Sequence, residues 1–266
     1  MRRHIPLASR REHLLGVALG IAAIGWDAPT NRLTTDLARD LADLSSPDRD
    51  RRGSAAVRIG RRGSKAASAV PRLAQSVLND PSADVRGYAA SALGAIGPSA
   101  EPGVDALARA TSDADLGVAR RAIVAIGEIG PKAVKALPKL RRRLADPDPN
   151  FRRIAARALG GLAAKAEPAA DELVARMFND DDPVVCREAA HALGAIGRPV
   201  SRVVPALTEI VADDDIAPST RYAAVTALGQ IGPSARSAVE PLRHVANDPD
   251  ANLASAAKKA IAAVSR

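Results

Sequence analysis

Residues 89–97 read AASALGAIG, and closely similar phrases recur along the chain. The first glycine of each phrase lies 33 to 35 residues after the one before it, and a separate column of leucines keeps the same steps. A repeat of this length predicts a helical solenoid, in which each unit packs only on its neighbours. The two columns are Gly60, Gly94, Gly127, Gly160, Gly194 and Gly229, and Leu73, Leu107, Leu140, Leu173, Leu207 and Leu242.

The composition favours an all-helical fold. Aromatic residues make up 2% of the 266 residues, so the core must consist of alanine, leucine, valine and isoleucine. Alanine is the strongest helix former, and no run of alternating β-branched and polar residues suggests a strand. We therefore expect residues 31–266 to form a right-handed α–α superhelix of about six helix-pair repeats with terminal capping helices.

Each repeat contains the same boundary signals. An Asp-Pro or Asp-rich turn starts it, because aspartate accepts the free backbone N–H groups of a helix start. We expect the first helix to end at the Leu-Gly pair, where glycine takes the left-handed conformation. A short loop then leads to a second helix that opens with proline or an acidic residue. These opening residues are Pro71, Asp105, Pro138, Asp171, Pro205 and Glu240.

Residues 1–30 permit two interpretations. A basic head is followed by an uncharged stretch from Leu14 to Trp26, as in an export signal, and Arg10-Arg11 resembles a twin-arginine motif. Alternatively, the stretch from Arg11 to Gly25 is a stretched, zeroth copy of the repeat. Both remain open, with export to the periplasm or cell envelope favoured over a cytoplasmic location. The uncharged stretch is too short for an ordinary membrane span.

Residues 31–44 predict an amphipathic helix that closes the open end of the array. Leu33, Leu37, Leu41 and Leu44 share one face, and Thr30 or Asn31 supplies the N-cap. A polar outer face on such a terminal helix keeps the last repeat soluble.

Residues 84–97, DVRGYAASALGAIG, carry a family resemblance. An Asp-rich turn followed by Val-Arg-x-x-Ala-Ala-x-Ala-Leu-Gly-x-Ile-Gly resembles the HEAT-like repeats named for phycobilisome lyase subunits. The resemblance covers residues 47–248. It implies an α-solenoid, but it is poor evidence of function because the repeat is a structural unit used by many activities.

Two enzyme classes share this repeat, and the sequence fits neither well. The HEAT-repeat deoxyhypusine hydroxylases hold iron with His-Glu pairs, whereas none of His4, His13, His191 and His244 is followed by glutamate. The bilin lyase subunits act on a tetrapyrrole, for which one cysteine and few aromatic residues offer little. We therefore expect no enzyme activity, no catalytic residues, no metal and no cofactor.

One column of the first helices contains Arg52, Arg86, Arg152 and Arg221. We expect each arginine to pair with an aspartate of a nearby inter-repeat turn and so to tie adjacent repeats together. Ala119 and Cys186 are the exceptions. Without a neighbouring histidine or base motif, Cys186 is expected to be a small filler rather than a reactive thiol.

The second helices are predicted to provide the binding face, because in HEAT-like arrays the second helices usually line the concave surface. In the third repeat, Leu137, Leu140 and Leu144 define the buried stripe, which sends Lys139 and Arg142 to the opposite side. The predicted partner-binding residues are Arg72, Arg109, Lys139, Arg142, Arg143 and Arg176.

These observations favour a non-enzymatic protein-interaction scaffold that binds an acidic partner along its concave face. The formal net charge of +8 is consistent with such a partner. A nucleic-acid-binding solenoid is a first alternative, which has the charge but lacks aromatic stacking platforms and a known reading motif. A lyase or chaperone-type subunit is a second.

Overall fold

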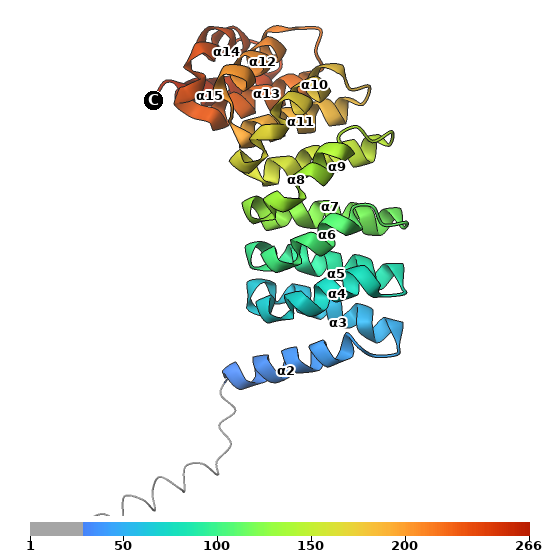
Figure 1. The fold of residues 1–266 in the computed structure, drawn as a ribbon. Helices are drawn as coiled ribbons and strands as arrows, with labels where there is room; N and C mark the ends of the chain where they lie inside the picture. Colours follow the sequence, from blue (N-terminus) through green and yellow to red (C-terminus); the bar gives the residue numbers. More distant parts are fainter. Residues whose placement is uncertain (1–28) are drawn as a thin grey trace, which may run out of the picture. The chain divides into compact units, whose positions relative to one another are not determined.

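The computed structural model describes residues 29–266. The two interpretations of the N-terminal segment fall on residues outside this range. Within it, every regular element is a helix (Figure 1), so the expected all-α solenoid is confirmed. The compact unit of the array begins at Asp40 and ends at Arg266.

Six helix pairs follow one another in the described part of the chain, as the repeat count predicts (Figure 1). The first helices of the pairs are α3 (Arg49–Arg61), α5 (Ala83–Ile96), α7 (Leu116–Ile129), α9 (Pro149–Gly161), α11 (Pro183–Ile196) and α13 (Pro218–Ile231). The second helices are α4 (Val70–Asn79), α6 (Val104–Ala110), α8 (Leu137–Arg143), α10 (Ala170–Asn179), α12 (Val200–Ala212) and α14 (Val239–Val245).

Two further helices flank the pairs. The first, α2 (Pro29–Asp43), starts two residues earlier than expected, so Thr30 and Asn31 lie inside the helix instead of capping it. The last, α15 (Ala251–Val264), is capped by the Asp250 carboxylate, which accepts from the Asn252 and Leu253 amides.

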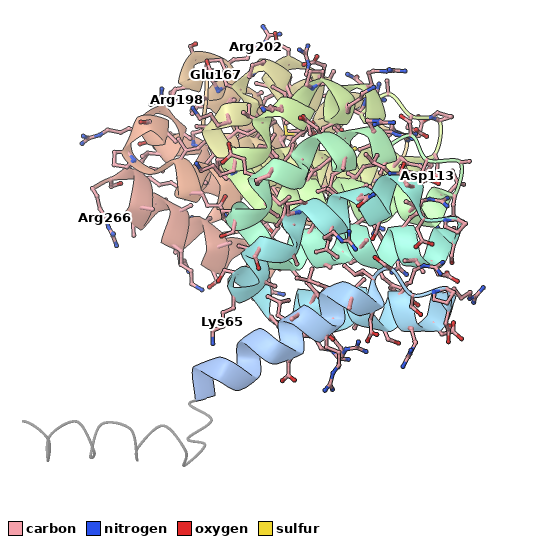
Figure 2. The ribbon with its side chains drawn as sticks, turned by 60° about the horizontal axis from the view of Figure 1, so that its bottom comes forward. Lys65, Asp113, Glu167, Arg198, Arg202 and Arg266 are labelled. Atoms are coloured by element: carbon pink, nitrogen blue, oxygen red, sulfur yellow. The ribbon has the colours of Figure 1, made fainter. Side chains whose placement is uncertain are left out.

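The connection within a pair is more regular than the predicted loop. In five pairs it is a 3₁₀ segment: η3 (Gly63–Ala69), η4 (Gly97–Gly103), η5 (Gly130–Ala136), η6 (Ala163–Ala169) and η7 (Gly232–Ala238). The second helix then begins one residue before the predicted proline or acid. In the fifth pair α12 begins at Val200 and runs through Pro205, so the prediction was wrong by five residues there. Figure 2 shows Asp113, from an inter-repeat turn, at one edge of the unit and Lys65 and Glu167, from two of these connections, toward the other.

The Leu-Gly glycines do not end the first helices, contrary to prediction. Gly94 lies inside α5, and the helix ends instead at Gly97, which has a φ of +72°. Gly94 serves a different purpose, because a Cβ there would lie 2.9 Å from the Ala125 Cα of the next first helix. A Cβ on any of the six glycines of the column would lie 2.7–3.2 Å from the Cα of an alanine, in the next first helix for five of them and in α15 for Gly229. The absence of a side chain therefore lets consecutive first helices touch backbone to backbone.

The predicted arginine–aspartate ties are confirmed. Arg152 donates from Nε and Nη2 to the two carboxylate oxygens of Asp180, both at 2.7 Å, and from Nη1 to the Asp146 carbonyl at 2.9 Å. The Arg152 side chain is 11% exposed and that of Asp180 is fully buried. Arg52 and Arg86 form equivalent bidentate pairs with Asp80 and Asp113. Each pair therefore fastens one repeat to the turn that starts the next.

The aspartates of the turns divide two tasks between them. Asp80 accepts from Arg52 and also from the Ser82 amide at 2.9 Å, so it shapes the turn itself. Other aspartates, such as Asp148, cap the following helix by accepting from its first amides. The Asp-rich composition of the turns thus has two structural uses, as the sequence indicated for the caps.

Replacing Gly194 with alanine should be strongly destabilising. The added Cβ would lie 2.6 Å from the Ala227 Cβ and 2.7 Å from its Cα, and a helix backbone cannot move aside as a side chain can. We expect a loss of about 2–3 kcal/mol in the free energy of unfolding, measured by urea denaturation. Gly117→Ala is the control, because its Cβ would meet only the Asp115 carboxylate, and it should be neutral or slightly stabilising. Equal effects of the two substitutions would contradict the close-contact role.

The ion pair between Arg86 and Asp113 should make the free energy of unfolding depend on pH in the acid range. The hydrogen bonds from Arg86 hold the pKa of the Asp113 carboxyl below its ordinary value of 3.8. A lowered pKa in the folded state stabilises the fold above about pH 4, and this contribution is lost as the pH falls through the folded-state value. Asp113→Asn should therefore cost about 1–3 kcal/mol near pH 7, and the difference from wild type should shrink below pH 4.

The control for this experiment is Asp84→Asn. The Asp84 carboxylate is exposed and lies 3.6 Å from an equally exposed Arg49. Such surface pairs contribute little, so this variant should follow the wild-type curve of unfolding free energy against pH. A constant difference between Asp113→Asn and wild type from pH 7 to pH 3 would show that the pair does not carry the acid dependence.

Candidate functional site

Within residues 29–266, no group of His, Cys, Asp or Glu side chains is arranged to hold a metal ion. None of the helices described there combines the length and apolar character that a bilayer crossing requires. The candidate sites in this part of the chain are the exposed faces of its two rows of helices.

Four of the six predicted partner-binding residues keep free or largely free head groups on the second helices. Arg72, Arg109 and Arg142 are exposed, and Lys139 is half-buried. Arg72 donates to the Ser45 hydroxyl. Lys139 and Arg142 meet at a small depression of about 260 Å³ beside the turn that follows α8. The structure therefore brings this pair together, whereas Arg72 and Arg109 lie on earlier helices.

Arg143 and Arg176 belong to the internal framework. Arg143 donates to the Thr111 carbonyl, pairs with Asp146 and stacks over the Phe151 ring, with 4.4 Å from Cζ to the ring centroid. Arg176 pairs with Asp180 at 3.4 Å. Both guanidinium groups are already engaged, so their contribution to a partner surface would require breaking these contacts.

The exposed side of the first helices carries larger apolar groups. Tyr88 on α5, Val124 on α7 and Tyr222 on α13 are 36%, 41% and 43% exposed. The sequence contains two tyrosines, Tyr88 and Tyr222, and both are therefore partly exposed on this side. We call this side, together with the same side of α15, the first-helix face. It is defined by Tyr88, Arg120, Arg121, Val124, Arg157, Arg187, His191, Tyr222 and Lys259.

Helix spacing favours the first-helix face as the inner side of the array. Consecutive first helices touch through glycine and alanine, whereas consecutive second helices make far fewer contacts with one another. A row of repeats that is more closely spaced on one side bends toward that side. The family resemblance instead predicts that the second helices line the inner, concave side. The glycine column, taken as a packing signal rather than a helix terminator, would have pointed to the first helices.

The arginines of this face fall into two groups. Arg121 stacks over Tyr88, with 5.0 Å from Cζ to the ring centroid, and Arg157 pairs with Glu188 at 3.2 Å. Among residues 29–266, no carboxylate forms a salt bridge with Arg120, Arg187 or Lys259. The face thus retains cations without a carboxylate partner, which can meet an acidic group.

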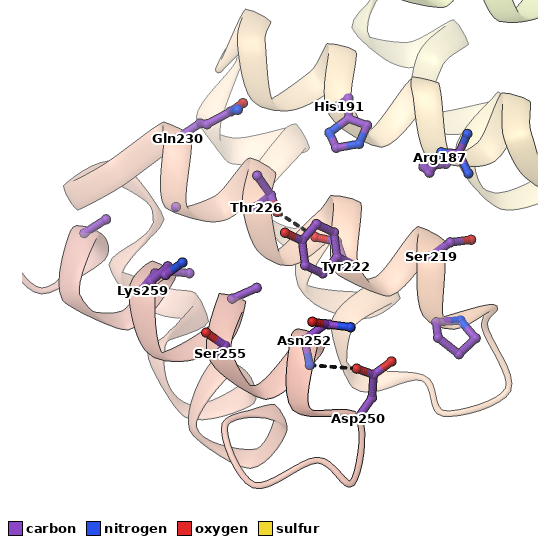
Figure 3. Close-up of a pocket in the computed structure, with 15 residues that line it drawn as sticks. Arg187, His191, Ser219, Tyr222, Thr226, Gln230, Asp250, Asn252, Ser255 and Lys259 are labelled. Carbon is purple, nitrogen blue, oxygen red and sulfur yellow. Dashed lines mark hydrogen bonds between the residues drawn. The ribbon is translucent and has the colours of Figure 1, made fainter.

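A groove opens on the first-helix face at its C-terminal end. It crosses α11, α13 and α15, has a volume of about 900 Å³, and is lined by Arg187, His191, Tyr222 and Lys259 among others (Figure 3). A smaller groove of about 500 Å³ lies beside Tyr88, between α3 and α5. The sequence analysis missed both, although the tyrosines at positions between the constant letters of the repeat were a visible signal.

Cys186 replaces the ladder arginine of the fifth repeat. Its thiol donates to the carbonyl of Asp180, six residues earlier, at 3.3 Å. In its own repeat Arg152 donates to the equivalent carbonyl, that of Asp146. Burial raises the pKa of the thiol above its ordinary value. Both observations support the predicted role as a filler.

Comparison with known proteins identifies the repeat. The family model for HEAT repeats matches residues 70–160, 104–185, 137–218 and 170–262, which together span most of the chain. Among curated proteins, none matches the sequence.

Three solved structures share the fold at low identity. An engineered protein is 23% identical, with 86% of this chain and 68% of the other covered and a TM-score of 0.60. The YibA protein of Escherichia coli is 19% identical, with 99% and 100% covered and a TM-score of 0.57. The complex of CpcE and CpcF of phycocyanin lyase from Nostoc sp. PCC7120 is 20% identical, with 86% and 94% covered and a TM-score of 0.53. At these identities the likeness establishes the fold alone.

The Cys186 thiol should react slowly with a disulfide reagent at neutral pH. The raised pKa leaves little thiolate, which is the reactive species, and the half-buried position restricts access. We expect a rate at least about tenfold below that of free cysteine at pH 7, with full reactivity restored in urea. Cys186→Ser, which abolishes the signal, is the control, and a rate equal to that of free cysteine would contradict the filler role.

Proposed function

Because the chain belongs to the HEAT repeat family, we propose that it is a non-enzymatic scaffold that binds a partner protein along the first-helix face. The observation that carries this proposal is the placement of both tyrosines on that face, exposed and beside unpaired or stacked arginines. Tyrosine and arginine are enriched at the energetically dominant positions of protein interfaces. An exposed apolar surface rimmed by polar groups is also typical of an interaction site.

The partner is proposed to present an acidic surface. Arg120, Arg187 and Lys259 have no carboxylate partner among the described residues, and the chain carries a net charge of +8. A complementary charge on the partner would speed association and would also disfavour basic proteins. Lys139 and Arg142 provide a second basic patch on the second helices, which remains the surface predicted from sequence.

The narrower kinship to the repeats of phycobilisome lyase subunits is part of the proposal. It is supported by the letters of residues 84–97 and by the fold shared with CpcE and CpcF. No lyase activity is proposed from this kinship, because a repeat fold hosts many activities.

Affinity capture with matched variants tests the binding face. The tagged full chain is used as bait in an extract of the organism that encodes it, and retained proteins are identified by mass spectrometry and cross-linking. Tyr88→Ala with Tyr222→Ala should reduce recovery of a specific partner at least about tenfold, because truncating an interface tyrosine typically costs more than 1 kcal/mol. Lys139→Glu with Arg142→Glu is the matched double variant of the second helices.

Each outcome decides between surfaces. Loss of the partner only in the tyrosine variant, with cross-links to α5 or α13, supports the first-helix face. Loss only in the Lys139→Glu, Arg142→Glu variant would assign binding to the second helices, as the sequence predicted. Release of the partner by nuclease would indicate a nucleic-acid binder, and recovery of no specific partner would contradict the scaffold function.

A further inference from the structure

The groove across α11, α13 and α15 has the form of a binding channel. Its walls are the exposed sides of α11, α13 and α15, and its volume of about 900 Å³ exceeds the 500 Å³ of the groove beside Tyr88. Figure 3 shows Tyr222 in the middle of the groove, with Arg187 and His191 on one side and Lys259 and Asn252 on the other. A segment lying across these helices would therefore meet the aromatic ring and both cations.

The side chains that line the groove carry more positive than negative charge. Among the described residues, neither Arg187 nor Lys259 forms a salt bridge. The acidic lining residue, Asp250, directs one carboxylate oxygen to the Asn252 amide at 2.8 Å and to the Leu253 amide at 3.2 Å, so it is occupied as the cap of α15. Asp250 keeps its negative charge, so the groove sets two cations against one carboxylate, and neither cation is held in a salt bridge.

The remaining polar groups suit a polypeptide backbone. Burial lowers the pKa of His191, so its ring is neutral near pH 7 and both donates and accepts hydrogen bonds. Gln230, Asn252 and Ser255 also line the groove and also offer donors and acceptors. A peptide backbone presents N–H and C=O groups in alternation, which is the pattern such side chains can satisfy.

We propose that this groove binds an extended acidic segment of the partner protein, with carboxylates on Arg187 and Lys259 and an apolar side chain against Tyr222. The proposal rests on the proposed scaffold function and adds the chemistry of the partner's contact segment. A rigid helical groove that receives an extended segment needs no rearrangement of its own backbone, because its walls are continuous helices.

A nucleic-acid strand fits this groove less well. A phosphate backbone carries a charge at every nucleotide and is usually gripped by several cations and by successive aromatic rings. The groove offers two unpaired cations, one exposed aromatic ring and the Asp250 carboxylate at its edge. This balance favours a segment with a few carboxylates spaced among uncharged residues.

Fluorescence anisotropy with synthetic peptides tests the proposal directly. The probe is a fluorescein-labelled nine-residue peptide in which glutamate alternates with leucine and phenylalanine. Matched peptides carry glutamine or lysine in place of glutamate, and a single-stranded oligonucleotide of equal charge represents nucleic acid. We expect the full chain to bind the acidic peptide at least about tenfold more tightly than the glutamine peptide, and more tightly than the oligonucleotide.

The variants locate the site. Arg187→Glu with Lys259→Glu should weaken acidic-peptide binding at least about tenfold, because two attractive contacts become repulsive. Lys65→Glu with Lys135→Glu changes the net charge by the same amount at exposed lysines of η3 and η5, away from the groove, and should alter binding less than about twofold. Tyr222→Ala should weaken binding while Tyr222→Phe retains it. Circular dichroism checks folding, and Arg187→Ala with Lys259→Ala replaces the charge reversal if that variant is unfolded.

Several results would overturn the proposal. These are no binding of the acidic peptide, equal binding of acidic and glutamine peptides, tighter binding of the oligonucleotide, or equal loss in the two double variants. Failure of the groove is distinguishable from failure of the scaffold function. A chain that captures a partner through the first-helix face but ignores acidic peptides keeps the function and loses only this assignment, whereas recovery of no partner removes the function itself.

Discussion

The contact between a glycine of one first helix and an alanine of the next is the constraint on which the architecture depends. With Gly94 against Ala125 and Gly194 against Ala227, the backbones approach to a distance that leaves no room for a single methyl group. Six such contacts in series fix the spacing of the repeats on one side of the array. Consecutive second helices, as described, make no such glycine–alanine contact, which favours the first-helix side as the shorter path. The spacing of the repeats on this side of the array thus follows from the smallest side chains in the sequence.

The arginine–aspartate pairs complete what the glycine contacts begin. Each buried guanidinium, such as that of Arg152, is held by a carboxylate of one turn and a carbonyl of another, so it fixes the distance between turns as well as their charge balance. Cys186 reaches the equivalent carbonyl without a carboxylate partner, which shows that the carbonyl contact can be kept when the ion pair is absent. Backbone contact sets how closely repeats stack, and these pairs set how the turns align.

The repeat length, the all-helical class and the arginine–aspartate pairing could be predicted because each depends on residues that recur at fixed spacing. The structure differs from the prediction where a residue's role depends on contacts with residues distant in the sequence. Arg143 looks like a free surface cation beside Arg142, but the Thr111 carbonyl and the Phe151 ring engage it, and no periodicity reveals that. The glycine column was visible too. The general preference of helix ends for glycine predicts that this column ends the first helices. In α5 the helix instead continues past Gly94 to Gly97, which has a positive φ.

Stability alone does not account for the exposed part of the Tyr222 side chain, which amounts to 43%. An alanine there would favour the helix and remove exposed apolar surface, and alanine occupies many positions of this chain. Tyr88 differs, because its ring lies over Gly53 of the preceding first helix and so also fills space within the array. Tyr222 instead lies in a groove between two cations that have no salt-bridge partner. It is also the more exposed of the two tyrosines. An exposed apolar side chain placed where charge and apolar surface converge supports the proposed binding face.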